Sequence, residues 1–496
     1  MSNNRFNLID ESWIPIQGQG PVSLREIFSN QQSLQAIGGN AVQKISLIKL
    51  LLAIIQRAWT PQNDSRWKTE GISVMAEKTL KYLEDNYSLF YLYGDRPFLQ
   101  RIEASSARKM TIGTGEYPKP LSKDSSIVFF TQIPKKLSEA QQALFIVSLM
   151  NFSLGGIGHP IQGLNSTWAG YKSQKGGKVM ASSGPGTGTW TGNLHSFALG
   201  STLLETLWIN VLTEENIKQN SFWKKGLGTP PWELLFINED IAQDLKDSYM
   251  GCLVGMSRFV LLAGNDIHYA EGIRYPSHKT GWREPSISLK ESKKCNVKFI
   301  NTSKKPWREI TSLLSFFSTK NINDFKCQQL EWAHHKAEFG NLNTFGIWSG
   351  GLGVTFKMGD QDPKGKDDFV SSEIIFNLQA FGSDAYAVLI KEMANLEELS
   401  KNLEKSIRGY FKTLGGGKKN SFGRSVTEKA MSLFWNNCEE KFHSLIAACE
   451  SGKTESVYND FTKIVESVYN IFCSKESNKQ LISWAKNQPN TNRKEL

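Results

Sequence analysis

Basic residues give this sequence its clearest chemical pattern. Four cations are spaced by four, three and four residues: Lys401, Lys405, Arg408 and Lys412. At about 100° per residue, they fall within roughly 60° of arc on one side of a helix. Such a row predicts contact with a polyanion, for example the phosphates of nucleic acid. The alternative is a solvated helix face, because Glu397, Glu398 and Glu404 lie in the same segment and could form ion pairs within the helix.

Glycines accompany lysines in the segments that extend this pattern. The basic helix runs into GGGKKNSFGR (415–424), which adds Lys418, Lys419 and Arg424. Further lysines cluster in segments 172–178 and 290–308. Because glycine has no side chain, the backbone N–H groups beside it can approach a phosphate or a groove edge closely. These segments therefore favour a nucleic-acid partner.

Acidic residues offer a different chemistry in one short segment. Four aspartates lie close together there: Asp360, Asp362, Asp367 and Asp368. Their carboxylates could hold a divalent cation, which leaves a metal-dependent nucleic-acid-processing enzyme as the alternative function. Lys364 and Lys366 lie among them and favour a solvated loop instead. Metal-dependent cleavage that an Asp367→Ala variant loses would distinguish the enzyme from a binding protein.

Other catalytic patterns are incomplete. Gly452-Lys453-Thr454 ends like a phosphate-binding loop, but Ala447 stands where that motif requires glycine. Asp266 and His268 could share one face of a strand, yet no third ligand lies near them in sequence. The sequence contains no GxSxG motif. We therefore predict a protein with no catalytic residue, no metal and no cofactor.

Composition sets the class of protein that carries these residues. The chain has 496 residues, of which 40% are hydrophobic and 21% are charged, as is typical of a globular protein. Its formal charge of +10 favours an anionic partner. The six cysteines include no CxxC pair, and neither a secretory signal nor an apolar membrane span is visible. These features predict a reduced, cytoplasmic protein without membrane association.

The pattern of apolar residues changes along the chain, which indicates two kinds of elements that must position these residues. Residues 1–366 mix helical patterns at 42–58, 73–87 and 138–152 with strand patterns at 293–301 and 344–356. Residues 367–496 carry amphipathic helical stripes whose apolar faces must cover one another. We predict an α+β fold: a large irregular mixed domain followed by an all-α, four-helix-type bundle.

Several strings, in this order, resemble one known family. They are FNLIDESWIPI (6–16), FYLYGDRPFLQ (90–100), KGGK followed by SGPGTG (175–188), IWSGG (347–351) and GDQ (359–361). Together with the helical C-terminal region they resemble CasA, the large subunit of the type I-E CRISPR Cascade complex. The resemblance spans essentially the whole chain, and FNLIDESWIPI is its most specific string.

The resemblance implies a non-catalytic subunit of an RNA-guided antiviral complex. Members of this family recognise the protospacer-adjacent motif (PAM) in double-stranded DNA, promote duplex opening and R-loop formation, and recruit a helicase-nuclease. The protein reads the short motif while the guide RNA reads the target sequence. The implied partners are the other Cascade subunits, the CRISPR guide RNA, the target duplex with its displaced strand, and the helicase-nuclease.

The resemblance also assigns roles to particular residues. Gly176 and Gly177, with Lys178 beside them, match the glycine loop that reads the minor groove. Gln361 matches the glutamine wedge that separates the first base pairs. Residues Phe129, Lys135 and Lys136 match the region that contacts the 5′ handle of the guide RNA.

Two features depart from the family pattern. Some members carry a cysteine-rich zinc site before the YPSH region (275–278), where this chain has only Cys252 nearby. Asn265 is the nearest counterpart of the lysine that joins the glycine loop in reading the motif. Which base sequence the protein reads therefore stays open.

Overall fold

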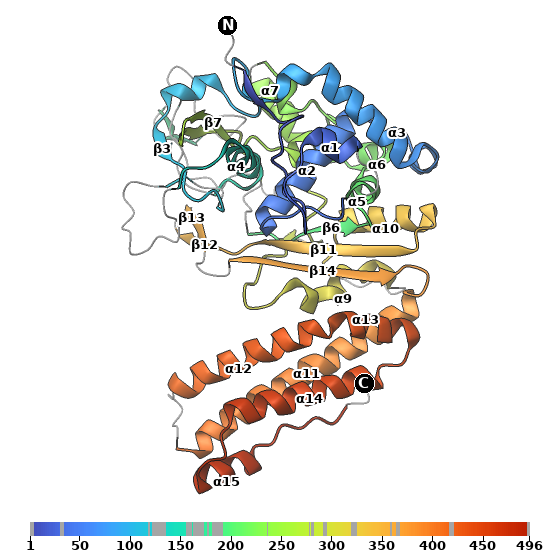
Figure 1. Cartoon of the computed structure of the whole chain (residues 1–496), viewed down its shortest axis with the longest axis vertical. Helices are drawn as coiled ribbons and strands as arrows, with labels where there is room; N and C mark the ends of the chain where they lie inside the picture. The colour runs from blue at the N-terminus through green and yellow to red at the C-terminus, as the bar shows by residue number, and fades with distance from the viewer. Residues whose placement is uncertain are drawn as a thin grey trace. The chain divides into compact units, whose positions relative to one another are not determined.

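A computed structural model of the chain divides into two compact units (Figure 1). The first comprises residues 1–306 and 325–373, and the second comprises residues 307–324 and 374–496. The structure describes residues 4–29, 34–117, 120–121, 135–154, 161, 173–175, 178–180, 192–235, 237–276, 278, 282–290, 295–318, 325–357, 360–363, 368–415 and 421–493. The first unit mixes helices and sheets and the second is helical, which confirms the predicted α+β class. The units divide within a strand after residue 373, whereas the change of texture in the sequence placed the boundary after residue 366.

Helices of the first unit surround one buried central helix, α2. The helices of this unit, α2 included, are α1 (Leu24–Ser29), α2 (Ala41–Ala58), α3 (Asp64–Asp85), α4 (Glu139–Phe152), α5 (Leu203–Asn210), α6 (Glu214–Gln219), α7 (Glu239–Lys246), α8 (Tyr249–Leu253) and α10 (Gln328–Gly340). Asn40 and Gln43 start α2 with a reciprocal capping box, in which each side chain accepts from the other residue's backbone N–H at 3.0 Å. Because α2 is apolar on nearly every side, neighbours must cover it all round.

Strands of the first unit form small antiparallel sheets. The three-stranded ones are β14 (Phe369–Asn377)–β11 (Thr344–Leu352)–β6 (His195–Leu199) and β3 (Lys109–Thr111)–β8 (Asp266–Glu271)–β7 (Arg258–Ala263). The two-stranded ones are β1 (Arg5–Asn7)–β2 (Tyr91–Tyr93), β4 (Ser173–Lys175)–β5 (Lys178–Met180), β9 (Leu289–Lys290)–β10 (Asn296–Val297) and β12 (Val354–Lys357)–β13 (Asp360–Pro363). Within the strand predicted at 293–301, the described residues form β10 and an isolated bridge between Phe299 and Asn193, and residues 293–294 lie outside the described residues. Gly353 divides the one predicted at 344–356 into β11 and β12.

The most specific strings of the sequence build the scaffold. FNLIDESWIPI contributes β1 and FYLYGDRPFLQ contributes β2, and the two strands pair with Asn7 opposite Tyr91. Trp13 is buried and its indole N–H donates to the Leu8 carbonyl at 3.0 Å. In IWSGG, a side chain on Gly351 would lie 2.6 Å from the Asn193 carbonyl oxygen, so close backbone approach requires glycine there. These residues of the strings therefore serve packing within the first unit.

Helices of the second unit pack their apolar stripes together, as predicted for the C-terminal region. They are α9 (Ile310–Leu313), α11 (Ser383–Thr413), α12 (Ser421–Glu440), α13 (Phe442–Ser451), α14 (Glu455–Phe472) and α15 (Asn478–Lys486). The buried face of α11 includes Leu403, Ile407 and Tyr410. Gly452 ends α13 with a left-handed φ of 68°, so the glycine of Gly-Lys-Thr is a helix cap. No helix among the described residues has the length and apolar composition to cross a membrane.

Residues 307–318 join the second unit through aromatic packing. The buried Trp307 ring lies 4.9 Å from that of Phe442 and 5.9 Å from that of Trp435. Arg308 stacks over Trp435, with its guanidinium carbon 3.4 Å from the ring centroid, and bonds Glu397 at 3.0 Å. This long-range packing explains why a segment with no helical stripe belongs to the helical unit.

Candidate nucleic-acid interface

Two β-hairpins carry the residues matched to motif reading and duplex opening. In β4–β5, Lys175 pairs with Lys178, so the register leaves two residues for the connection, Gly176 and Gly177. Those two glycines lie outside the described residues, and Lys178 is placed on β5 by its backbone. In β12–β13, Lys357 pairs with Asp360 and Phe356 pairs with Gln361. Gln361 therefore lies on a strand close to the tip of its hairpin.

The β12–β13 hairpin follows directly from one end of the β14–β11–β6 sheet. His195, the first residue of β6, pairs with Gly350 near the end of β11. The chain leaves β11 directly into β12, while the segment after β5 enters β6 through Gly192. A side chain on Gly192 would lie 2.9 Å from Val354, the first residue of β12, so these connections touch. The antiparallel register thus brings the chain before β6 to the base of the β12–β13 hairpin, while residues 181–191, which follow β5, lie outside the described residues.

Buried polar contacts fix the chain where it leaves α4 toward the β4–β5 hairpin. Arg258, at the start of β7, donates to Ser153 Oγ at 2.6 Å and to the Leu154 carbonyl at 2.9 Å. Its guanidinium carbon lies 5.2 Å from the centroid of the Tyr269 ring. Because Arg258 is itself buried, these bonds lie in a low-dielectric interior where they are strong.

Asn265 positions the segment matched to the guide-RNA handle. It occupies the tip of the β7–β8 hairpin, beside Gly264 with φ of 69°. Its side-chain amide donates to the Lys135 carbonyl at 3.1 Å and accepts from the Leu137 N–H at 3.0 Å. Lys135 and Lys136 are exposed, and Phe129 lies outside the described residues. The residue nearest to the family's motif-reading lysine is therefore engaged in holding this segment.

The basic row lies on one exposed face of α11. Its four members are exposed: Lys401, Lys405, Arg408 and Lys412. Arg408 pairs with Glu404 at 2.6 Å, and Lys401 lies 3.9 Å from Glu398. These exposed pairs each contribute little to stability and leave the face cationic toward its C-terminal end. Arg424 is exposed on α12, whereas Lys418 and Lys419 lie outside the described residues.

A buried polar cluster, not apparent in the sequence, joins α2, β6 and residues 282–288. Lys49 Nζ lies 2.7 Å from Glu284 Oε1, with only 2% and 7% of their side chains exposed. The Ser286 hydroxyl donates to Glu284 at 3.0 Å and lies 3.0 Å from His195 Nδ1. Burial, reinforced by Lys49, lowers the pKa of His195 to about 4 despite the opposing charge of Glu284. The imidazole is therefore neutral at pH 7.

This cluster resembles a catalytic site in residue types but is closed to substrates. Cys252 lies beside it, and burial raises the pKa of its thiol well above its ordinary value, so the thiolate is disfavoured. Burial alone would raise the pKa of Glu284, but Lys49 and the neighbouring histidines hold it below its ordinary value. The space among these side chains is about 10 Å³, no more than a water molecule requires. We interpret the cluster as structural.

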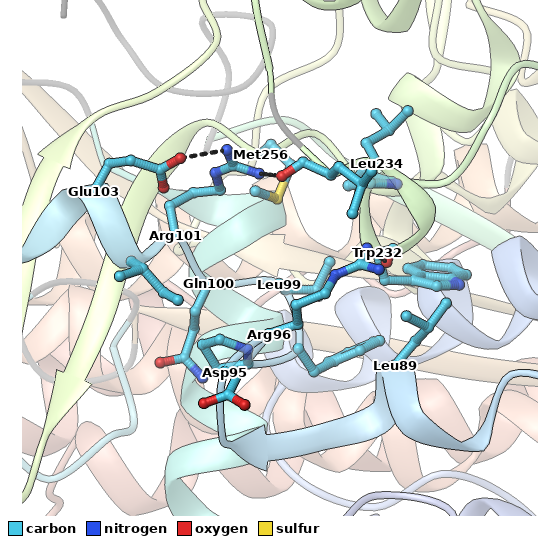
Figure 2. A pocket seen from close by; sticks show the side chains of 15 residues that line it. Leu89, Asp95, Arg96, Leu99, Gln100, Arg101, Glu103, Trp232, Leu234 and Met256 are labelled. Carbon is cyan, nitrogen blue, oxygen red and sulfur yellow. Dashed lines mark hydrogen bonds and ion pairs between the residues drawn. The ribbon is translucent and has the colours of Figure 1, made fainter. Parts of the chain in front are cut away.

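A small surface pocket lies between residues 95–103 and 231–235 (Figure 2). Its volume is about 110 Å³. Arg101 bonds Glu103 at 2.9 Å and the Leu235 carbonyl at 3.2 Å, and Arg96 donates to the Trp232 carbonyl at 3.3 Å. Both guanidinium groups are thus engaged by the protein, and the pocket joins two chain segments.

The described residues of the aspartate segment form no metal-binding geometry. Asp360 and Asp362 lie on β13, Asp367 is outside the described residues, and Asp368 is buried with its carbonyl accepting from Gly353 N–H at 2.7 Å. The described part of the chain contains no group of three or more His, Cys, Asp or Glu side chains that could hold a metal ion. His268 instead places its Nδ1 2.9 Å from the Ala107 carbonyl oxygen.

Comparison with known proteins identifies one family. The profile of the CRISPR-associated protein Cse1 family matches residues 7–468. No curated protein matched the chain.

Solved structures of the same kind share the fold at low sequence identity. Thermobifida fusca Cse1 has a TM-score of 0.69 at 17% identity, over 97% of this chain and 96% of that one. A CasA from Thermus thermophilus has a TM-score of 0.68 at 18% identity, over 97% and 98% of the two chains. A chain of a CRISPR RNA-guided surveillance complex has a TM-score of 0.64 at 15% identity, over 97% and 98%.

Proposed function

Since the chain belongs to the CRISPR-associated Cse1 (CasA) family, we propose that it is the non-catalytic large subunit of a type I-E Cascade complex. The family match over residues 7–468 carries this proposal, because it includes both hairpins and most of the helical unit. The fold shared with a chain of a CRISPR RNA-guided surveillance complex supports assembly with other Cascade subunits and a guide RNA. The proposed setting is the cytoplasm, where the complex defends the cell against foreign DNA.

In this function the two hairpins act on the target duplex. Gly176, Gly177 and Lys178 read the protospacer-adjacent motif from the minor groove, and Gln361 separates the first base pairs. The hairpin registers support this division, because that of β4–β5 leaves Gly176 and Gly177 for the connection and that of β12–β13 puts Gln361 near the tip. Phe129, Lys135 and Lys136 contact the guide-RNA handle. The opened target then allows a helicase-nuclease to be recruited.

Gln361→Ala should slow R-loop formation more than it weakens initial duplex binding. A wedge acts by replacing stacking between two base pairs, which costs a few kcal/mol per step. We expect R-loop formation about tenfold slower, measured by stopped-flow fluorescence of a base analogue beside the motif. Gln17→Ala, at an exposed glutamine elsewhere in the first unit, is the control. Equal losses of binding and opening would exclude the wedge role.

The basic row on α11 should bind phosphates without reading bases. Changing Lys401, Lys405, Arg408 and Lys412 together to alanine should weaken DNA binding by the assembled complex similarly for all sequences. Each duplex phosphate neutralised contributes ~0.9 to the log–log salt slope, so the loss of four cations should lower the slope by up to ~3.6. Alanine favours helix, so the thermal midpoint should change little.

The row's control is Lys429→Ala, an exposed cation on α12 outside the row. An unchanged salt slope in the quadruple variant would indicate that the row is a solvated helix face and binds no DNA. Loss of nuclease recruitment at constant DNA affinity would instead identify a protein-docking face.

Affinity purification from cells that carry the CRISPR locus tests the function as a whole. The tagged full chain should co-purify with other Cascade subunits and a small guide RNA, and the assembly should bind target duplex only beside a particular short motif. A chain that purifies alone, without RNA or protein partners, would refute the proposal.

A further inference from the structure

An exposed aromatic ring lies where α12 begins, beside the end of α11. Phe422 is 68% exposed, the second-largest exposure among the large apolar side chains of the described residues. Its ring meets that of Phe411 edge to face, with centroids 5.9 Å apart and planes at 86°. Phe411 in turn meets Tyr410, which is buried in the bundle, at 5.1 Å and 89°. A chain of ring contacts therefore fixes Phe422 while most of its surface stays open to solvent.

Exposed cations lie near this ring in the chain and at the adjoining end of α11. Lys412 follows Phe411 at the exposed end of α11, and Arg424 is exposed two residues after Phe422. The Lys479 ammonium at the start of α15 lies 3.7 Å from where a side chain on Gly415 would begin, so it reaches the end of α11. The nearest acidic residue along α12 is Glu428, one turn beyond Arg424. The basic row, which spans ~16 Å of helix, ends at Lys412.

The pairing of an exposed aromatic ring with cations indicates what this surface binds. Proteins that bind single-stranded nucleic acid combine a cationic path for the backbone with aromatic rings on which bases stack. The centres of protein–protein interfaces, in contrast, are depleted in lysine. Building on the proposed function, we infer that Phe422 is a stacking platform for a base of single-stranded DNA, such as the strand displaced during R-loop formation. Lys412 and Lys479, at the adjoining end of α11, hold the adjacent phosphates.

Binding of a 15-nucleotide oligo(dT) by the full-length chain tests the platform. Phe422→Ala should raise the dissociation constant about 5- to 100-fold, because losing the stacking of one base on an aromatic ring weakens binding by about that factor. Its salt slope should match wild type, since no charge is lost. Phe422→Trp should retain affinity, whereas Phe422→Leu, which is apolar but not aromatic, should lose it.

Two matched measurements separate stacking from charge and from general surface effects. Lys412→Ala with Lys479→Ala should lower the salt slope by ~1.4, at ~0.7 per single-strand phosphate. Ile390→Ala removes an exposed apolar side chain on α11, ~30 Å along the helix from Phe411. It should leave the dissociation constant for oligo(dT) unchanged. An abasic oligonucleotide of the same length should bind wild type and Phe422→Ala equally, because it offers no base to stack.

Three outcomes would overturn the inference. They are wild-type oligo(dT) affinity in Phe422→Ala, full affinity in Phe422→Leu, and loss of a protein partner with unchanged oligo(dT) affinity. Each of these leaves motif-dependent binding by the assembled complex intact, so the proposed function would survive. Failure of the chain to join an RNA-containing complex would refute that function separately.

Discussion

Replacing Lys49 by methionine lowers the free energy of unfolding of the first unit by about 3–5 kcal/mol, because it leaves the Glu284 carboxylate buried without its partner. Methionine fills a similar volume, so the loss reflects charge rather than a cavity. Hydrogen exchange measured by mass spectrometry on peptides of α2 and of residues 282–288 reports this stability separately from that of the second unit.

Lys44→Met is the matched control on the same helix. Lys44 lies 3.1 Å from Glu373, but the two side chains are 15% and 38% exposed, so water already stabilises both charges. Its loss should cost no more than about 1 kcal/mol. Adding Glu284→Leu to Lys49→Met should recover part of the stability, since an apolar pair avoids the burial of a lone charge. Equal effects of Lys49→Met and Lys44→Met would show that the buried pair is not stabilising.

Gly177→Asp should weaken motif-dependent DNA binding by the assembled complex about 10- to 100-fold while the chain stays folded. A side chain in the two-residue connection of β4–β5 would keep the backbone away from base edges, whose contacts contribute ~1–3 kcal/mol each. The measurement compares dissociation constants for duplexes with and without the motif, together with the thermal midpoint of the protein.

Two variants interpret the Gly177→Asp result. Gly177→Asn has nearly the same size without the charge, so equal losses would indicate a steric block and a smaller loss would indicate repulsion from phosphates. Gly20→Asp places the same charge at an open position of the first unit, with nothing within 4 Å of the added Cβ, and should bind DNA normally. A lower thermal midpoint with retained motif preference would mean that the glycine serves only the fold.

Local patterns in the sequence predicted several elements well. Apolar residues at spacings of three and four predicted the buried face of α11, and the same periodicity placed the basic row on its opposite face. The helix predicted at 42–58 is α2, which begins one residue earlier at its capping box. Helices are recognisable in this way because their hydrogen bonds and side-chain neighbours lie within four residues.

Long-range contacts were beyond such patterns. Lys49 and Glu284 are separated by 235 residues, and nothing around either one indicates an ion pair. Asn265 was known only as the counterpart of a missing lysine, and its bonds to the backbone of Lys135 and Leu137 depend on how the β7–β8 hairpin packs beside α4. Phe422 looked like one apolar residue in a glycine-rich connection until its exposure and its contact with Phe411 were defined.

The sequence by itself determined the family, the α+β class, the helical C-terminal region and the cationic face of α11, because each depends on a string of residues or on a short period. The tertiary structure decided which of the remaining residues meet. It paired FNLIDESWIPI with FYLYGDRPFLQ, brought the chain before β6 to the base of β12–β13, and closed the Lys49 cluster to substrates. Such contacts follow from the packing of whole helices and strands. A local sequence period does not specify where these elements lie relative to one another.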